Sequence, residues 1–257
     1  MNKDSSRISG MFNGIAGNYD FLNHLLSFNI DKYWRSRMVN FLLRLPGYHT
    51  HNYKVLDIAC GTGDSTIALY RKGMAVTGID IAQKMMDIAI AKNKKLEKEQ
   101  KHGKCRRGEN EQQKKENISG VPVPEYRLAS AEAIPFPDHS FDAVTISFGI
   151  RNFNRRPQCL GEIYRVIKPG GAIAVLEFAK PKNSIIRFIY NTYFNNILPL
   201  IGDMISKDKG AYKYLAESVE QFPKYEAFCS EITNAGFKET DYHKYTFGIA
   251  VLYTGKK

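Results

Sequence analysis

Two glycines and an aspartate are spaced in a way that suits the binding of a ribose. Gly61 and Gly63 lie between an aliphatic run and a helical segment, and Asp80 ends a second aliphatic run, 17 residues after Gly63. Glycine permits positive φ and close approach of a ligand to the backbone, and a carboxylate at a strand end can accept both ribose hydroxyls. The alternatives are a plain tight turn for the glycines and a helix N-cap for Asp80. The third glycine of a dinucleotide fingerprint and the GK[ST] of a phosphate loop are both missing, so the ligand need not carry phosphate.

Further polar and small residues follow two later aliphatic runs. Ser130 and Ala131 come after the third run, and Ser147 ends the fourth. The carboxyl ends of parallel strands share one edge of a sheet, and open α/β sheets bind ligands there. We therefore expect these residues to join Asp80 in one cleft.

The elements that must position these residues alternate along the chain. Short β-branched and aliphatic runs predict strands, and segments of helical spacing separate them. This alternation favours a parallel, doubly wound α/β sheet. The expected strands are 54–59, 75–80, 125–129, 141–148 and 172–178, with helices at 65–72, 83–94 and 157–167 and a turn at 168–171.

The two ends of the chain depart from this alternation. Residues before about 48 carry helical apolar spacing and predict a helical cap over the active end of the sheet. Two helices are expected at 212–222 and 223–235, followed by an antiparallel hairpin of strands at 237–245 and 247–255. The chain of 257 residues is thus expected to form a single domain, 1–257, with a cap at 1–48 and substrate or lid helices at 180–222.

The formal charge of +11 comes in large part from one segment. Residues 92–116 contain ten Lys or Arg and five Glu, and they are almost free of apolar side chains. Such a composition predicts a basic, disordered insert at 92–120 that continues the preceding helix. A nucleic-acid-binding arm is the alternative, but no aromatic residue is interleaved to stack on bases.

Composition excludes several other classes of protein. No apolar run approaches the 18 to 20 residues or so that cross a bilayer, and the first residues resemble neither a signal nor a transit peptide. The four cysteines have no CxxC spacing, so neither a zinc site nor a disulfide framework is indicated. We expect a cytoplasmic protein without a metal.

The assembled motifs identify a resemblance to class I S-adenosylmethionine-dependent methyltransferases, and within them to the quinone C-methyltransferases of the UbiE/MenG type. The matching segments are VLDIACGTGD, GIDIAQKM, AEAIPFPDHSFDAVTISFGIRNF, YRVIKPGG, VLEFAKP, YKYLAESV and AGF. GIRN and LEF-KP are far more specific than the glycine turn. The resemblance runs from about Tyr19 to the C-terminus, except for the insert. It implies a Rossmann-like seven-stranded sheet.

The resemblance also implies the cofactor, the reaction and the cofactor contacts. S-adenosylmethionine is the expected methyl donor, and C-methylation of demethylmenaquinol to menaquinol is the expected reaction. A benzoquinol of ubiquinone biosynthesis or another phenolic acceptor remains an alternative, as does a noncatalytic cofactor-binding scaffold. The expected cofactor-binding residues are Asp57, Gly61, Thr62, Gly63, Asp80, Ser130, Ala131 and Ser147. Cys60 stands where many members have Gly, and His24 and Asp31 stand where several relatives have Asp and His.

Arg151, Asn152 and Tyr19 are the candidate catalytic residues that follow from the resemblance. An Arg beside a phenol lowers its pKa, and an Asn can donate to or accept from the same hydroxyl. Their alternatives are a salt bridge from Arg151 to Glu177 at the rim and an Asx-turn at Asn152. Tyr19 is a candidate lid residue or else a buried core tyrosine. His243 is a weaker candidate base and is better explained as an exposed histidine.

A polyprenyl tail would need an apolar trough, and residues 185–198 are rich in Ile, Phe, Tyr and Leu. An ordinary core helix explains part of this pattern, and a tail channel or membrane-facing surface explains the rest. Lys180, Lys182 and Arg187 would then lie near lipid headgroups. The expected partners are the polyprenyl quinol and a peripheral contact with the inner face of the cell membrane, but not nucleic acid.

Overall fold

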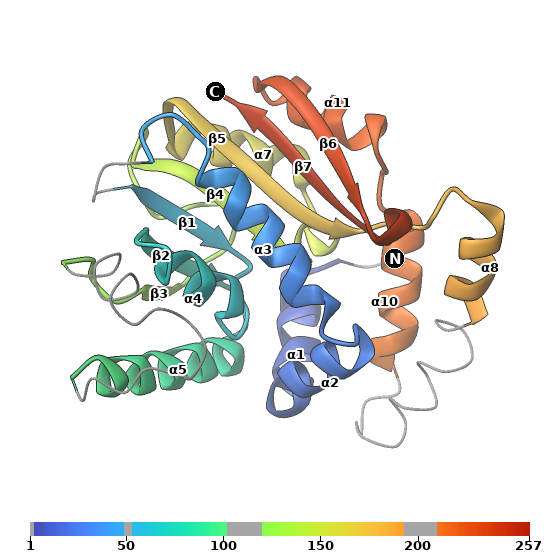
Figure 1. The fold of residues 1–257 in the computed structure, drawn as a ribbon, viewed down its shortest axis with the longest axis horizontal. Helices are drawn as coiled ribbons and strands as arrows, with labels where there is room; N and C mark the ends of the chain where they lie inside the picture. Colours follow the sequence, from blue (N-terminus) through green and yellow to red (C-terminus); the bar gives the residue numbers. More distant parts are fainter. Residues whose placement is uncertain (1–2, 49–52, 102–119, 193–209) are drawn as a thin grey trace.

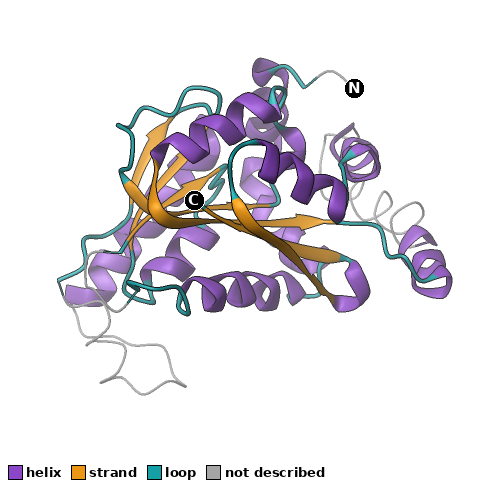
Figure 2. Ribbon diagram, turned by 90° about the horizontal axis from the view of Figure 1, so that it is seen from above, coloured by secondary structure: helices purple, strands orange, loops and turns teal. Residues whose placement is uncertain are grey.

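The structure is a computed structural model that describes residues 3–48, 53–101, 120–192 and 210–257. Within these residues one seven-stranded sheet has helices on both faces (Figures 1 and 2). Its strands are β1 (Lys54–Ile58), β2 (Ala75–Asp80), β3 (Glu125–Leu128), β4 (Phe141–Ser147), β5 (Ile167–Phe178), β6 (Lys238–Tyr245) and β7 (Ala250–Lys256). The strand order is β3-β2-β1-β4-β5-β7-β6. The doubly wound α/β fold predicted from the alternation is confirmed.

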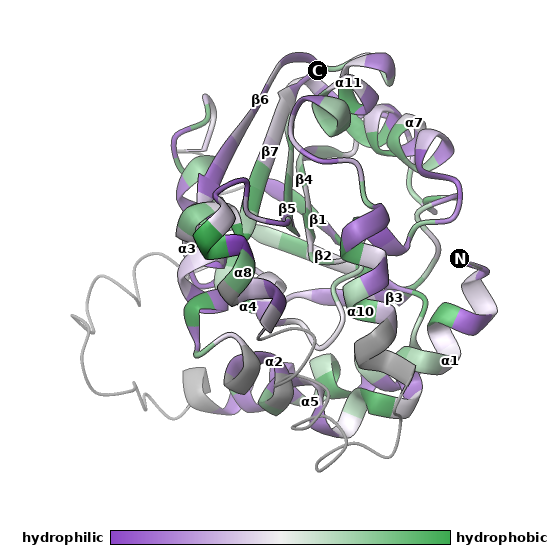
Figure 3. Cartoon of the chain, turned by 90° about the vertical axis from the view of Figure 1, so that its right-hand side faces the viewer, coloured by the Kyte–Doolittle hydropathy of each residue, from purple (hydrophilic) through white to green (hydrophobic). Residues whose placement is uncertain are grey.

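The five strands from β3 to β5 are parallel to their neighbours, whereas β7 pairs antiparallel with both β5 and β6. The predicted C-terminal antiparallel hairpin therefore forms, with its second strand next to β5. β7 is apolar and almost fully buried, whereas the edge strand β6 is hydrophilic and largely exposed (Figure 3). Polar side chains on an exposed edge discourage pairing with other chains.

The helices and short 3-10 turns connect these strands. They are α1 (Ser5–Ile15), η1 (Ala16–Asn18), α2 (Tyr19–Leu26), α3 (Ile30–Leu42), α4 (Asp64–Tyr70), α5 (Gln83–Lys101), η2 (Ile150–Asn152), α7 (Arg156–Val166), α8 (Ser184–Thr192), α10 (Gly210–Gln221), α11 (Glu226–Asn234) and η4 (Thr246–Gly248). Of the predicted helical cap, α1 and α2 lie over the cleft, whereas α3 packs on a face of the sheet. Residues 3–26, which we call the roof, lie at the carboxyl ends of the parallel strands (Figure 1).

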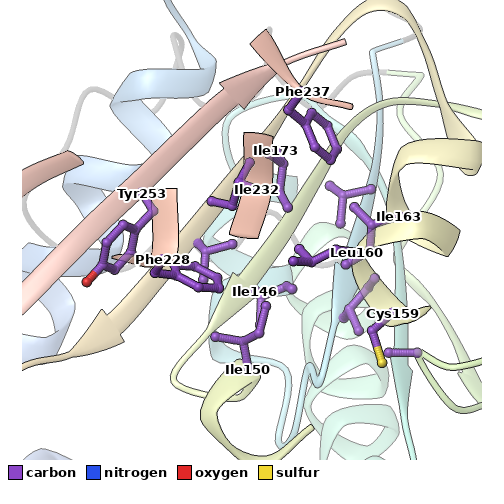
Figure 4. Packing of buried hydrophobic residues seen from close by; sticks show 14 of the residues in the cluster. Ile146, Ile150, Cys159, Leu160, Ile163, Ile173, Phe228, Ile232, Phe237 and Tyr253 are labelled. Atoms are coloured by element: carbon purple, nitrogen blue, oxygen red, sulfur yellow. The ribbon is translucent and has the colours of Figure 1, made fainter. Parts of the chain in front are cut away.

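Two buried clusters fix the helices to the sheet. On one face α7 and α11 pack on β4, β5 and β7 through residues such as Leu160, Ile163 and Phe228 (Figure 4). On the other face α3 and α4 supply Trp34, Met38 and Tyr70 among others. Side chains of this size contribute about 1.5–3 kcal/mol each when fully buried. The strands therefore end in a rigid platform.

The start of the insert and one turn differ in part from the expectation. The helix at 83–94 continues to Lys101, as expected for the start of the insert, but Lys92 and Asn93 make tertiary contacts instead of projecting into solvent. The first part of the predicted insert is therefore helical, and residues 102–119 lie outside the described residues. The turn predicted at 168–171 is instead an irregularity within β5, where Gly170 N donates to the carbonyl of Lys257.

Candidate active site

A cleft opens at the carboxyl ends of β1, β2, β3 and β4, beneath the roof. Its empty volume is about 740 Å³ including its mouth, which suits a small-molecule ligand. The residues that line it come from the ends of these strands and the loops after them, from the roof, and from α5 and α7. They are Lys3, Ser5, Ile8, Phe12, Tyr19, Ile58, Ala59, Gly61, Asp80, Ile81, Met85, Ala129, Ser130, Ala131, Glu132, Ser147, Phe148, Gly149, Asn152, Phe153, Asn154 and Cys159.

The turn after β1 brings bare backbone to the cleft. Ala59, Gly61 and Gly63 all have positive φ, at 53°, 55° and 83°. A Cβ placed on Gly61 would meet no atom within 4 Å, so the space in front of this glycine is open to a ligand. Gly63 plays a different part, because its Cβ would lie 2.5 Å from the hydroxyl of Tyr126. The predicted glycine cradle is thus present at Gly61, and Gly63 allows the turn to pack.

Asp80 lies at the end of β2 and faces the cleft with a largely buried carboxylate. Its Oδ2 accepts from Gly61 N and its Oδ1 from Ala82 N, each at 2.8 Å. Burial raises the pKa of Asp80, and the backbone N–H donors of Ala82, Gly61 and Ile81 act in the opposite direction. Each carboxylate oxygen has a further lone pair. Asp80 thus binds backbone N–H groups of the turns after β1 and β2, ahead of the first residue of α5, and its carboxylate stays in the lining of the cleft.

The residues predicted after β3 and β4 also line the cleft. Ser130 Oγ accepts from Glu132 N at 3.2 Å and stabilises the turn after β3, with Ala131 next to it. Ser147 contributes differently from the expectation, because its hydroxyl accepts from Ser65 Oγ at 2.9 Å and faces Met38. Ser147 nevertheless lines the cleft.

Asp57 and Thr62 are outside the cleft lining, although both were expected to contact the cofactor. Asp57 is fully buried beneath the turn, where its carboxylate accepts from Thr66 Oγ1 at 2.6 Å and Thr145 Oγ1 at 2.8 Å. Desolvation raises the pKa of Asp57 to about 6. The Thr62 hydroxyl donates to Asp20 on α2. Asp57 thus supports the turn from below, and Thr62 joins it to the roof.

Arg151 is buried and its charge is already compensated. Its Nη1 lies 2.7 Å from Glu177 Oε1 and also donates to the carbonyl of Phe148, while its Nε is 3.3 Å from Ser218 Oγ on α10. Arg151 is also absent from the residues that line the cleft. The ion pair with Glu177 that the sequence left as an alternative therefore forms, in the interior and not at the rim. Direct polarisation of a substrate by this guanidinium does not fit its position.

Asn152 and Tyr19 both line the cleft. Asn152 Oδ1 accepts from Tyr214 Oη at 3.0 Å, which leaves its amide N–H groups as the donors of this side chain. Burial raises the pKa of Tyr19, and a hydrogen bond with Asn23 acts in the opposite direction. Tyr19 is therefore a protonated phenol at neutral pH. His243, by contrast, is exposed on β6, 3.8 Å from Asp241 Oδ2.

Several lining residues were not identified from the sequence, above all those of α1. Ile8 and Phe12 cover the cleft, and Ser9 Oγ donates to the carbonyl of Ile81 at 2.8 Å. Lys3 Nζ donates to the carbonyl of Arg151 at 2.6 Å. The apolar spacing of α1 was visible in the sequence, but spacing does not show which element a helix packs against.

The described residues contain no cluster of His, Cys, Asp or Glu arranged to hold a metal ion. In the same part of the chain, no helix is both long and apolar enough to cross a bilayer.

Comparison with known proteins confirms the resemblance noted in the sequence. The profile of the ubiE/COQ5 methyltransferase family matches residues 1–257. A ubiquinone/menaquinone biosynthesis C-methyltransferase of Geobacter sulfurreducens is 39% identical over 100% of this chain and 91% of its own length. A demethylmenaquinone methyltransferase of Thermus thermophilus is 40% identical over 96% of this chain and 100% of its own.

Solved structures with the same fold are more distant in sequence. A Thermotoga maritima structure described as a SAM-dependent methyltransferase, possibly acting on histamine, has a TM-score of 0.58 at 18% identity and covers 96% of this chain and 99% of its own. A Methanococcus maripaludis structure described as an S-adenosyl-L-methionine-dependent methyltransferase has a TM-score of 0.58 at 16% identity, covering 94% and 91%. The seven-stranded sheet and its antiparallel end are therefore those of the class I methyltransferase fold.

Proposed function

Because the chain belongs to the ubiE/COQ5 methyltransferase family, we propose that it methylates a ring carbon of a polyprenylated quinol, with demethylmenaquinol as substrate and menaquinol as product. The chain is an S-adenosylmethionine-dependent C-methyltransferase of quinone biosynthesis. The names of relatives include both menaquinone and ubiquinone pathways. The benzoquinol of the ubiquinone pathway is accordingly the competing substrate.

One observation carries the proposal: Asp80 and Gly61, which suit the cofactor, line the same cleft as Asn152 and Tyr19, which suit a phenolic substrate. The carboxylate of Asp80 and the open backbone at Gly61 fit a ribose and its neighbouring groups. The turns at Ser130, Ala131 and Ser147 offer backbone atoms to the rest of the cofactor. When bound, S-adenosylmethionine supplies an electrophilic methyl group on a sulfonium.

The substrate chemistry requires an electron-rich ring. An oxidised quinone is electron-poor, whereas a quinol ring is activated when a hydroxyl is held as, or close to, its phenolate. Asn152 can donate an amide N–H to that oxygen, and the protonated Tyr19 can donate its O–H. Both act by orienting the ring and stabilising the developing charge. Alignment of reacting groups can lower a barrier by about 7–11 kcal/mol.

Arg151 acts in this proposal as a positioning residue. It ties η2, which carries Asn152, to Glu177 on β5 and to Ser218 on α10. Tyr214 of the same helix holds the Asn152 amide. The positive charge and these contacts fix the direction of the Asn152 N–H groups, and α10 helps to exclude water.

The tail of the quinol suggests where the chain works. We place it in the cytoplasm, at the inner face of the cell membrane, where a polyprenyl substrate resides. α8 supports this placement, since Ile185 and Phe188 are largely exposed. The apolar residues predicted further along this region, at 193–198, lie outside the described residues.

Methyl transfer from labelled S-adenosylmethionine tests the proposal. The acceptors are demethylmenaquinol, the corresponding benzoquinol and bulk RNA, each with and without reductant. We expect transfer to demethylmenaquinol at least 10-fold faster than to the benzoquinol, dependence on reductant, and none to RNA. Preference for the benzoquinol would move the chain to the ubiquinone pathway, and transfer to RNA alone would overturn quinol methylation.

Variants then separate the role of Asn152, which would contact the substrate, from that of Arg151, which would position Asn152. Asn152→Ala is expected to lower kcat with cofactor affinity unchanged. Arg151→Lys should lower kcat less than Asn152→Ala, and Arg151→Ala more than Arg151→Lys. Unchanged turnover in Arg151→Ala, with normal cofactor binding, would contradict the positioning role.

A further inference from the structure

Three segments that are distant in sequence expose large apolar side chains on the same side of the molecule. They are the turn from α2 into α3 with Phe28, Ile30 and Tyr33, the η4 turn with Phe247, and α8 with Ile185 and Phe188. These six account for most of the large hydrophobic side chains that are exposed among the described residues. We call this set the apolar tip.

Direct contacts hold the first two segments together. The rings of Tyr33 and Tyr245 lie edge to face with centroids 6.1 Å apart. Next to them Trp34 Nε1 donates to Thr246 Oγ1 at 2.8 Å. Phe247 follows Thr246 directly, so the start of α3 and the η4 turn form one surface.

The η4 turn is joined in the same way to the chain that leads into α8. Ala179 N donates to the carbonyl of Ile249 at 2.9 Å. A Cβ on Gly248 would lie 4.0 Å from the Cα of Pro181, and α8 begins at Ser184. Figure 1 shows α8 at the same side of the molecule as the turn between β6 and β7.

Two of these residues combine a left-handed backbone with an exposed aromatic ring. Phe28 and Phe247 have φ of 50° and 58°, values that are unfavourable for bulky residues. Their side chains are nevertheless 73% and 78% exposed. Two large rings thus stand largely exposed on turns with a left-handed backbone.

Basic side chains surround the tip. Lys182 and Lys244 lie over the Tyr225 ring at 4.5 and 4.8 Å from its centroid, and Arg37 lies over Tyr245 at 5.8 Å. Lys32 Nζ donates to Asn29 Oδ1 at 2.7 Å. Within the described residues none of these four cations forms an ion pair with a carboxylate. Glu226 is the carboxylate that acts on two of them, because the pKa of Glu226 is lowered first by its hydrogen bond from Tyr242 and in addition by the charges of Lys182 and Lys244.

We propose that the apolar tip inserts into an anionic phospholipid bilayer, with Lys32, Lys182 and Lys244 binding the headgroups. Protruding aromatic and aliphatic side chains interleaved with lysine suit the interface of a bilayer. The tip also adjoins the active site, since Trp34 packs on Phe148, which lines the cleft. Docking would bring the cleft close to lipid. The purpose of this contact rests on the proposed quinol substrate, but the contact itself can be measured separately.

Flotation with vesicles tests the docking surface. The probes are phosphatidylcholine vesicles with and without 25% or so phosphatidylglycerol, and the proteins are the wild type, Phe28→Ser/Phe247→Ser and Lys32→Glu/Lys182→Glu. Leu128→Ser is the matched control, because Leu128 is 57% exposed on β3, at the other edge of the sheet. Emission from Trp34, the single tryptophan of the chain, checks that the region around η4 keeps its fold.

We expect the wild type and Leu128→Ser to float with the anionic vesicles, and both double variants to bind at least 10-fold less. Equal binding by Phe28→Ser/Phe247→Ser would overturn the proposal, and so would equal binding to vesicles without phosphatidylglycerol. A wild type that does not float but is dimeric in sedimentation, with Phe28→Ser/Phe247→Ser monomeric, would identify the tip as a subunit interface instead.

Activity distinguishes this proposal from the proposed function. Phe28→Ser/Phe247→Ser should methylate a short-tailed demethylmenaquinol in solution at the wild-type rate, and a long-tailed one in vesicles at least 10-fold more slowly. A wild type that floats but methylates neither quinol would refute the function and retain the docking surface.

Discussion

The floor and the roof of the cleft are held in place by different forces. The floor, which is made of the turns after β1, β2 and β4, rests on two large apolar clusters and on buried hydrogen bonds such as those of Asp57. The roof has a small cluster around Ala16, Ala82 and Met85. Its remaining anchors are polar, and they include Asp20 with Thr62 and with Lys92.

Apolar packing in the floor and polar anchors in the roof predict different responses to mutation. A floor that is packed like a protein core keeps its geometry with or without ligand. Partly exposed ion pairs contribute little, about 0.2–1 kcal/mol each, so a roof held by them can open at small cost. Changes in the floor should therefore alter stability or binding strongly, and changes in the roof should alter the exchange of ligand.

The largest effect is expected at Asp80. Asp80→Ala removes the carboxylate that faces the cleft and leaves Gly61 N and Ala82 N without their acceptor. Hydrogen bonds to a charged group contribute about 1.5–3 kcal/mol each, so affinity for S-adenosylmethionine should fall by about 100-fold or more. Asp80→Asn keeps one oxygen and should lose less. Calorimetric titration measures both, and an unchanged Kd in Asp80→Ala would remove this residue from the cofactor site.

A change at Gly149 tests the packing of the floor itself. A Cβ there would lie 2.5 Å from the Cβ of Ala59, so Gly149→Ala forces two strand ends apart and should lower the free energy of unfolding by about 1–3 kcal/mol. Gly161→Ala is the matched control, because its Cβ would meet no atom within 4 Å in α7. That variant should be more stable by up to about 1 kcal/mol. Urea denaturation compares the two, and equal stability would mean that the floor is more adaptable than its contacts indicate.

The floor could be predicted well from the sequence because its signals are local. Gly61 and Asp80 belong to short segments in which a strand, a turn and a helix follow one another, and the sheet topology then places their ends together. Asp57 was expected to contact the cofactor, but it lies outside the lining of the cleft. Its position in the motif is compatible with either side of the turn, and only the contacts with Thr66 and Thr145 reveal that it points into the interior.

The tertiary contacts of the roof were much harder to predict from the sequence. Its helices were expected from their apolar spacing, but the contacts of Asp20 join residues that are 42 and 72 positions apart, at Thr62 and Lys92. Lys92 shows the difficulty most clearly. Its surroundings in the sequence are low in complexity and basic, which predicts a solvated segment. Tertiary ion pairs with Asp20 and Asp64 outweighed that local composition.

The protonation of Asp57 gives the floor a pH dependence. Desolvation raises the pKa of Asp57 to about 6 from 3.8. Between these values the folded chain holds a proton that the unfolded chain has released, so stability falls as pH rises through this window. The loss between pH 4.5 and pH 7 should be about 2 kcal/mol. In Asp57→Asn this part of the dependence should disappear, as measured by urea denaturation at both pH values. A parallel decline in both proteins would assign the pH dependence to other groups.

The smallest effect on stability is expected in the roof. A change there should instead alter the kinetics of ligand exchange. Asp20→Asn weakens the pair with Lys92 Nζ, now 2.7 Å, while its remaining oxygen can still accept from Thr62. Since the pair is partly exposed, the free energy of unfolding should change by less than about 1 kcal/mol. Dissociation of S-adenosylmethionine, followed by stopped-flow displacement, should accelerate about three- to five-fold, and added salt should reduce the difference from the wild type.

Asp87→Asn is the matched control, because Asp87 accepts from Gln83 on the same helix as Lys92 and makes no contact with the roof among the described residues. Equal acceleration in both variants would mean that general electrostatics, and not the anchoring of α2, sets the rate.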